Sequence, residues 1–97
     1  MSTDLPTIDQ CTEVAEFLKN LAHPQRLMIL CLLSQGPMNV TELTDKIGAS
    51  QSGVSQFLTR MRLAGLIEGE RDGKTVIYRI ASQDAERLLN SLHDIFC

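Results

Sequence analysis

The sequence predicts a mainly α-helical fold that carries one β-hairpin. Between residues 51 and 63, apolar side chains recur at i, i+3, i+4 and i+7, the spacing of one buried helix face. These side chains are Val54, Phe57, Leu58 and Met61. Directly afterwards, two strand-forming runs, 66–71 and 75–80, flank Asp72-Gly73, which is a strong signal for a two-residue hairpin turn. A chain of 97 residues is expected to form one domain, residues 1–97, with a modest core.

The N-terminal third predicts a tail and two helices. Residues 1–7 are expected to form a short flexible tail. Thr7 or Asp9 can cap a first helix, residues 9–21, and Pro24 suits the first position of a second helix that runs to about Ser34. The first helix carries an apolar face made of Cys11, Val14, Ala15, Leu18 and Leu21. The second helix is apolar nearly all round, so we expect it to be the central buried helix.

The remaining residues predict a third, a fourth and a last helix around the hairpin. Asn39 with Glu42 three residues later matches a capping box, which predicts a third helix through Ile47. A short turn follows, Ser50 caps the fourth helix, and Ser82 caps a last helix over residues 82–97. The last helix has a long apolar stripe: Ala85, Leu88, Leu89, Leu92, Ile95 and Phe96. Helix, turn, helix and hairpin in this order predict a winged helix-turn-helix with about five helices and a two-stranded wing.

The polar face of the fourth helix suits the major groove of DNA. It presents short hydrogen-bonding side chains and one arginine, which match the donors and acceptors on base edges. Arg71 and Lys74 flank the predicted turn, where they can reach phosphates. A polar helix face alone is usually a solvated surface, but the helix, its glycine stop and the basic wing together favour DNA binding. The predicted DNA-contacting residues are Gln51, Ser52, Ser55, Gln56, Thr59, Arg60, Arg71 and Lys74.

The net charge of −3 does not exclude this function, because acidic and basic residues are unevenly distributed. Residues 24–80 contain seven basic and five acidic residues, whereas the two ends together contain two basic and seven acidic residues. The positive field of the central part is weak. Specific binding therefore depends on base contacts and on dimerisation more than on nonspecific attraction.

Composition and motifs exclude other classes of protein. The longest apolar run, residues 27–33, is too short to span a bilayer, and residues 1–7 lack the features of a signal peptide. A soluble cytoplasmic protein without a membrane partner is therefore expected. No phosphate loop, Cys-x-x-Cys motif or histidine cluster is present, so neither an enzyme nor a cofactor is predicted. A winged helix used only for protein–protein contact remains an alternative, and it predicts binding that is insensitive to salt.

The first and last helices together predict a homodimer. They carry more apolar surface than one small domain is expected to bury, and a solvent-facing stripe of that length promotes association. We therefore expect residues 9–21 and 82–97 to form a two-fold interface, although both helices can also pack only on their own domain. A dimer places two recognition helices about one DNA turn apart, which matches a pseudo-palindromic operator in double-stranded DNA.

Four sequence elements match a known family in combination: HPQRLMIL, SQSGVSQFL, MRLAGL and RDGKTVIYRI. With them, the chain from about Val14 onwards resembles the ArsR-type winged-helix repressors. Phe57 departs from the pattern, because the family commonly has histidine there; this removes one polar group at the edge of the buried stripe. The resemblance implies a homodimeric repressor that an inducer releases from its operator.

Many proteins of that family sense metal ions, and this chain lacks their usual ligands. They use Cys-x-Cys on the third helix, or Asp-x-His there with a later His and Glu on the last helix. Here the third helix has no cysteine, and the last helix offers Asp84 and a lone His93 beside Asp94. The ligand number of a tetrahedral site is missing, so no metal site is predicted. A metal-responsive repressor that uses His93, Asp84 or thiols across the dimer is the alternative.

The three cysteines carry little signal by themselves. Cys31 lies in an apolar helix and is typical of a small core residue, Cys97 is the final residue, and Cys11 belongs to the first helix. The resemblance pairs two of them. Cys31 and Cys97 match the cysteine pair of the subgroup represented by BigR, SqrR, YgaV and HlyU, which senses reactive sulfur species or oxidants. It implies that a disulfide or polysulfide bridge between Cys31 and Cys97 abolishes operator binding.

Overall fold

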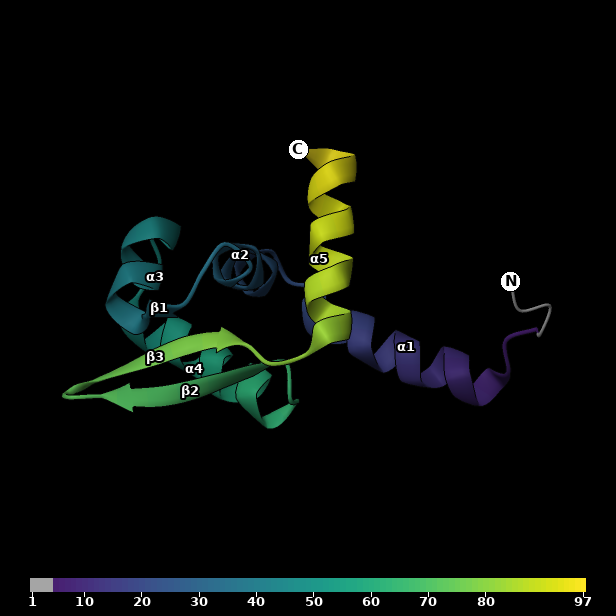
Figure 1. Cartoon of the computed structure of the whole chain (residues 1–97), viewed down its shortest axis with the longest axis horizontal. Helices are drawn as coiled ribbons and strands as arrows, with labels where there is room; N and C mark the ends of the chain where they lie inside the picture. The colour runs from purple at the N-terminus through teal and green to yellow at the C-terminus, as the bar shows by residue number, and fades with distance from the viewer. Residues whose placement is uncertain (1–4) are drawn as a thin grey trace.

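Five helices and three strands make up residues 5–97, the part of the chain that the computed structural model describes (Figure 1). In chain order they are α1 (Ile8–Leu21), α2 (Pro24–Leu33), β1 (Met38–Asn39), α3 (Val40–Ile47), α4 (Gln51–Leu63), β2 (Ile67–Asp72), β3 (Thr75–Ile80) and α5 (Gln83–Phe96). Helices α2, α3 and α4 and the sheet form the body, α1 extends away from it, and α5 stands beside α2 (Figure 1). Residues 1–4 of the expected tail lie outside the described residues.

Short-range hydrogen bonds set where the helices begin. Asn39 and Glu42 form the predicted capping box, in which the Asn39 side chain accepts from the Glu42 N–H at 2.8 Å. Ser50 and Ser82 cap α4 and α5, as the sequence predicts. Thr7, and not Asp9, caps α1. Each cap satisfies backbone N–H groups that the helix itself leaves unpaired.

The core lies where α2, α3, α4, β2 and α5 meet. Its buried residues are Leu21, Ile29, Leu30, Leu33, Leu43, Val54, Leu58, Met61, Leu66, Ile67, Ala85 and Leu89. The predicted stripe of α4 is confirmed, with Phe57 half-buried at its edge. The expectation that α2 is buried nearly all round is wrong: Met28 is exposed and Cys31 is half-buried, because no element covers that side of the helix fully.

The sheet has three strands, in the order β1-β3-β2, and not the two that the sequence predicts. Met38 pairs with Tyr78 and Asn39 with Ile77, which adds a short antiparallel strand before α3. The turn also differs. Asp72 pairs with Thr75, so the two loop residues are Gly73 and Lys74. Gly73 has φ +65°, a conformation that glycine adopts without steric cost, and Lys74 therefore lies at the tip of the wing.

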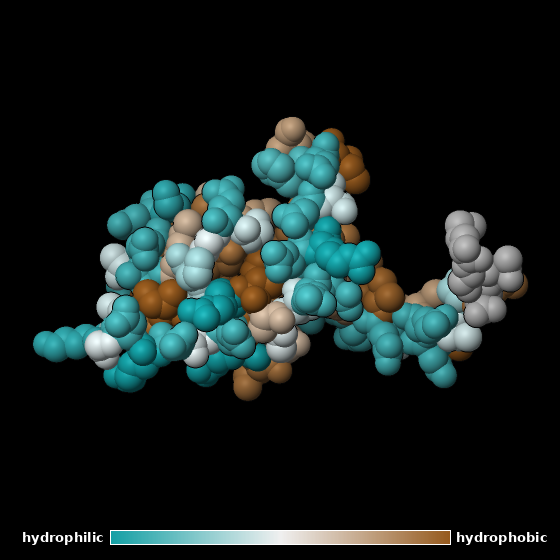
Figure 2. Space-filling view, in the orientation of Figure 1, coloured by the Kyte–Doolittle hydropathy of each residue, from teal (hydrophilic) through white to brown (hydrophobic). Residues whose placement is uncertain are grey.

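Only part of the predicted apolar faces of α1 and α5 is buried in this chain. Of the α1 face, Leu21 is in the core, whereas Val14 and Leu18 are 55% and 46% exposed. At the other end of the chain, Ile95 and Phe96 are 70% and 78% exposed. Figure 2 shows this apolar surface along α1 and at the free end of α5. Among residues 5–97, no helix has the length and apolar character needed to cross a bilayer.

Candidate nucleic-acid interface and dithiol cavity

The predicted recognition surface of α4 is open to solvent. All six predicted residues of this helix are exposed, on the side opposite the buried Val54, Leu58 and Met61. Ser55, Gln56, Thr59 and Arg60 line a shallow groove of about 340 Å³. The Thr59 hydroxyl donates to the Ser55 carbonyl at 3.0 Å, which leaves its lone pairs free to accept. This surface is therefore sterically free to meet base edges.

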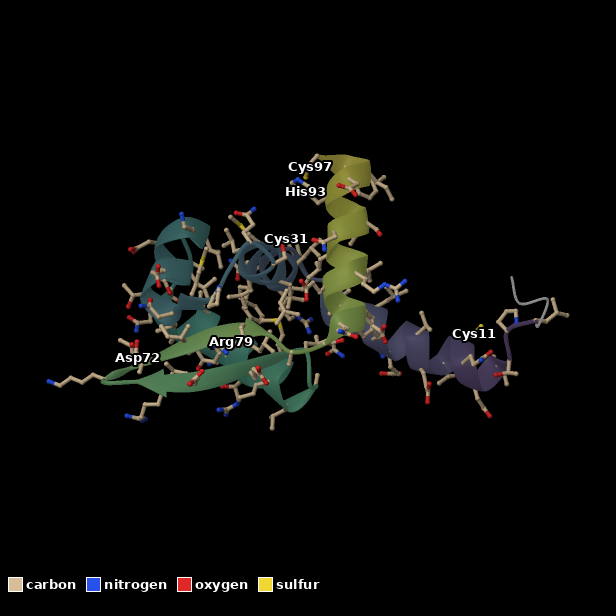
Figure 3. The ribbon with its side chains drawn as sticks, viewed as in Figure 1. Cys11, Cys31, Asp72, Arg79, His93 and Cys97 are labelled. Atoms are coloured by element: carbon tan, nitrogen blue, oxygen red, sulfur yellow. The ribbon has the colours of Figure 1, made fainter. Side chains whose placement is uncertain are left out.

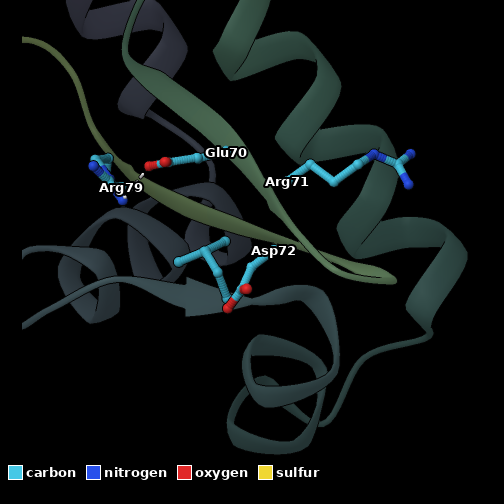
Figure 4. A pocket seen from close by; sticks show the side chains of 5 residues that line it. Glu70, Arg71, Asp72 and Arg79 are labelled. Carbon is cyan, nitrogen blue, oxygen red and sulfur yellow. Dashed lines mark ion pairs between the residues drawn. The ribbon is translucent and has the colours of Figure 1, made fainter.

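The wing presents its basic residues on one side and at its tip. Arg71 pairs with Val76 in the ladder and lies on the same face of the sheet as the buried Ile67, because side chains alternate along a strand. Arg79 lies on the opposite face, where its guanidinium contacts the Glu70 carboxylate at 3.0 Å. Figure 4 shows Arg71 pointing away from this ion pair. Arg71 and Lys74 are thus exposed cations without an ion pair in the described residues, whereas Arg79 is engaged.

A second hollow joins the recognition helix to the wing. This cavity, of about 270 Å³, brings together the predicted residues Gln51, Ser55 and Lys74. Its remaining lining residues are Asn39, Val40, Thr41, Thr75, Val76 and Tyr78. Sequence reasoning missed Thr41, Thr75 and Tyr78. The only signal for Thr41 was its place in the first turn of a capped helix, and no sequence pattern places Tyr78 beside α4.

Gly69 makes room for this arrangement. A Cβ atom on Gly69 would lie 2.8 Å from Cγ1 of Val76 and 3.1 Å from Cε1 of Tyr78. Tyr78 can therefore lie against the strand opposite only because residue 69 has no side chain.

The two cysteines at positions 31 and 97 line one cavity between α2 and α5. It has a volume of about 420 Å³, and its lining residues are Leu27, Cys31, Gln35, Leu92, His93, Phe96 and Cys97. Cys31 is half-buried, Cys97 is exposed, and both are free thiols. Burial, and secondarily the neighbouring Cys97, raises the pKa of the Cys31 thiol. Figure 3 shows Cys97 and His93 at the free end of α5, with Cys31 on α2 below them.

Two other candidate ligands, Cys11 and Asp84, do not line this cavity. Cys11 is exposed on α1, far from the pair (Figure 3). Asp84 and His93 are nine residues apart on α5, about 13 Å along the helix axis, so they cannot share a metal ion within one chain. Within residues 5–97, no three His, Cys, Asp or Glu side chains converge as metal ligands.

Comparison with known proteins places this geometry in a family. Residues 23–69 match the model for bacterial regulatory proteins of the arsR family. The biofilm growth-associated repressor of Agrobacterium fabrum is 45% identical over 94 residues, which are 96% of this chain and 80% of that protein. The chain belongs to the ArsR family. It is a DNA-binding transcriptional regulator with a winged-helix fold, as predicted, and not an enzyme.

Relatives of this ArsR-family regulator include the predicted subgroup. The regulator YgaV of Escherichia coli is 38% identical over 97 residues, covering 98% of each chain. Reduced HlyU of Vibrio cholerae superposes with a TM-score of 0.88 at 31% identity, covering 92% of this chain and 94% of that one. The homodimeric winged helix-turn-helix domain of Mb0332 from Mycobacterium bovis superposes with a TM-score of 0.79 at 31% identity, covering 98% and 89%.

Proposed function

We propose that this regulator is a homodimeric repressor that leaves its operator when sulfur bridges Cys31 to Cys97. The observation that carries the proposal is the shared cavity: two thiols far apart in the sequence line one apolar hollow between α2 and α5. The relatives support the repressor role, since the Agrobacterium fabrum protein is named a repressor. The location that matches this role is the cytoplasm, where the protein can bind chromosomal DNA.

The DNA-binding half of the proposal assigns roles to the exposed polar side chains. Gln51, Ser52, Ser55, Gln56 and Thr59 meet base edges in the major groove, where amide and hydroxyl groups read donors and acceptors. Arg60, Arg71 and Lys74 meet phosphates, which fixes the register of the protein on the duplex. The cavity that joins Gln51 to Lys74 supports this assignment because it brings a residue of the groove-reading helix and the tip of the wing to one surface.

The dimer half of the proposal rests on the apolar surface that the single chain leaves exposed. A shallow groove of about 300 Å³ runs along α1, and its lining residues are Pro6, Gln10, Cys11, Val14, Ala15 and Leu18. The exposed Ile95 and Phe96 on α5 supply a second apolar surface. We assign both surfaces to a two-fold interface with a second copy, and the homodimeric Mb0332 domain supports this assignment. The operator is then a pseudo-palindrome.

The switch needs no cofactor, only a donor of sulfane sulfur such as a hydropersulfide, RSSH. A cysteine thiolate attacks the outer sulfur of the donor and forms a protein persulfide. The rest of the donor leaves as RSH. The second thiol then displaces hydrogen sulfide and closes a disulfide. When both cysteines are first persulfidated, loss of hydrogen sulfide gives a trisulfide instead. Either bridge ties α5 to α2, and it changes the angle between protomers and hence the spacing of the two recognition helices.

Operator binding by a set of cysteine variants tests this proposal. In a Cys11→Ser background, the reduced protein should bind operator DNA and release it after polysulfide treatment. Mass spectrometry should then show an internal Cys31–Cys97 link, either a disulfide or a trisulfide with one added sulfur atom. Cys31→Ser and Cys97→Ser should each stay bound. Release of DNA by the variant in which Cys11, Cys31 and Cys97 are all replaced by serine would place the sensing chemistry outside the thiols. Release on adding Zn²⁺ to the reduced protein would favour the metal-responsive alternative.

A further inference from the structure

The dithiol cavity is larger than a sulfur bridge requires. One to three bridging sulfur atoms occupy a small part of about 420 Å³, a volume within the range of about 300–1,000 Å³ that pockets for small organic ligands have. Leu27, Leu92 and Phe96 supply apolar walls from both helices. Gln35 and His93 are the only lining residues with polar nitrogen groups in their side chains. A cavity with these walls is suited to an apolar organic ligand.

The charges around the cavity limit which organic ligands can enter it. None of its lining residues is Lys, Arg, Asp or Glu. An anionic group brought between α2 and α5 therefore loses water and finds no fixed cation, which makes its entry unfavourable. An uncharged carbonyl oxygen can instead accept from the Gln35 amide, which is a neutral donor.

We propose that this cavity also admits uncharged, apolar α,β-unsaturated carbonyl compounds, quinones included, and that Cys97 captures them covalently. The capture goes beyond the proposed sulfur switch, because it needs one thiol and the cavity and no bridge. Only the expected loss of DNA binding rests on the proposed function.

Access determines which thiol reacts. Cys97 is exposed at the end of α5, whereas Cys31 is half-buried and its raised pKa keeps it protonated at neutral pH. The Cys97 thiolate adds to the β-carbon of the ligand and forms a C–S bond. The π electrons of the double bond move towards the carbonyl oxygen, and the α-carbon then takes a proton from water. A quinone undergoes the same addition, but one oxygen takes a proton from water and the other takes the proton from the attacked ring carbon. The product is a hydroquinone thioether, and no external oxidant is consumed.

The bound ligand acts as a wedge. Its apolar part lies between Leu27 on α2 and Leu92 on α5, the space in which the two helices face each other. A covalent ligand that fills this hollow holds α5 apart from α2, because the packed side chains around it cannot move into the same volume. Because α5 also carries the apolar surface assigned to the dimer, holding α5 in this position changes the dimer and lowers operator affinity.

Two maleimides with the same reactive double bond test the proposal. N-benzylmaleimide is apolar and 3-maleimidopropionate is anionic, and a free thiol, N-acetylcysteine amide, corrects for their intrinsic reactivities. In the Cys11→Ser, Cys31→Ser protein, the ratio of the reaction rate with the benzyl compound to the rate with the anionic compound should be about tenfold higher for Cys97 than for the free thiol. This factor is equivalent to about 1.4 kcal/mol. The Cys11→Ser protein that carries the benzyl adduct should release operator DNA.

A matched variant separates the cavity from the thiol. Gln35 is exposed at the rim, so Gln35→Trp should leave the fold intact, which the unfolding temperature checks, and place a ring in the cavity. The preference for the benzyl compound should then disappear, and the unmodified variant should already bind operator DNA more weakly than the wild type, because its ring holds α5 apart from α2 as the adduct does.

Two results would overturn the inference: equal corrected rates for both maleimides, or slow reaction with both because a second copy covers the cavity. An adduct that leaves operator binding unchanged would instead overturn the proposed link between α5 and DNA binding. If polysulfide fails to release DNA but the benzyl adduct succeeds, the sulfur bridge is wrong and this inference stands.

Discussion

Replacing Lys74 by glutamine should reduce the salt dependence of operator binding by an amount that follows from the proposed homodimer, which has two Lys74 side chains. Lys74 lies at the tip of the wing, between the paired residues Asp72 and Thr75, and its side chain is exposed. Each phosphate that a cation neutralises contributes about −0.9 to the slope of log K against log salt concentration. A homodimer has two wings, so the variant should lose about 1.8 from the magnitude of this slope.

This change in slope has a direct consequence for affinity. Between about 50 and 200 mM salt, the variant should lose about tenfold less affinity than the wild type loses. At low salt the variant should bind all DNA sequences more weakly than the wild type does, and the loss of affinity should be the same for each sequence, since a phosphate contact carries no sequence information. Fluorescence anisotropy with operator and scrambled duplexes at four salt concentrations measures both quantities.

Arg79 provides the matched control. Arg79→Gln removes the same single positive charge from the neighbouring strand, but that guanidinium already contacts Glu70 at 3.0 Å on the other face of the sheet. Its slope should therefore equal that of the wild type. Equal slopes for Lys74→Gln and wild type, or an equal loss in both variants, would refute the assignment of the wing tip to DNA phosphates.

Four other variants or conditions test the remaining parts of the reasoning. Gln56→Ala should relax sequence preference and cost about 1–3 kcal/mol on the operator alone, measured against duplexes with single base changes. Val14→Asp should give a folded monomer in sedimentation, because Val14 is 55% exposed in the single chain; a dimer would place the interface elsewhere. Gly69→Ala should lower unfolding stability by about 1–3 kcal/mol, since the new Cβ would lie 2.8 Å from Cγ1 of Val76, and unchanged urea unfolding would contradict this. The raised pKa of Cys31 means that the native protein holds this proton more tightly than the unfolded chain; stability should therefore fall as pH rises from the usual cysteine range to the native value, and Cys31→Ala should reduce this fall.

The sequence by itself determined the elements whose hydrogen bonds are local. Asn39 with Glu42, Ser50 and Ser82 each satisfy N–H groups within three residues, so the starts of α3, α4 and α5 follow from short sequence motifs. The buried stripe of α4 follows in the same way from the period of the helix. The family resemblance also came from the sequence, because its motifs occupy these local elements.

Tertiary structure decided what depends on distant partners. Strand β1 is two residues long, and it exists only because Met38 meets Tyr78 forty residues later. Propensity cannot foresee such pairing, since its hydrogen bonds form only when the chain is already folded. The hairpin turn also lies one residue later than the sequence predicts, because the ladder between β2 and β3 extends to Asp72 and Thr75.

The thiol cavity shows the same division most clearly. Composition alone favoured a core role for Cys31 and an incidental one for Cys97, and only the resemblance paired them. The packing of α5 beside α2 leaves one side of α2 incompletely covered, and this gap both exposes the two thiols to each other and creates the apolar volume around them. Local sequence specifies which helices form, whereas the volume left between two helices depends on how their side chains pack together.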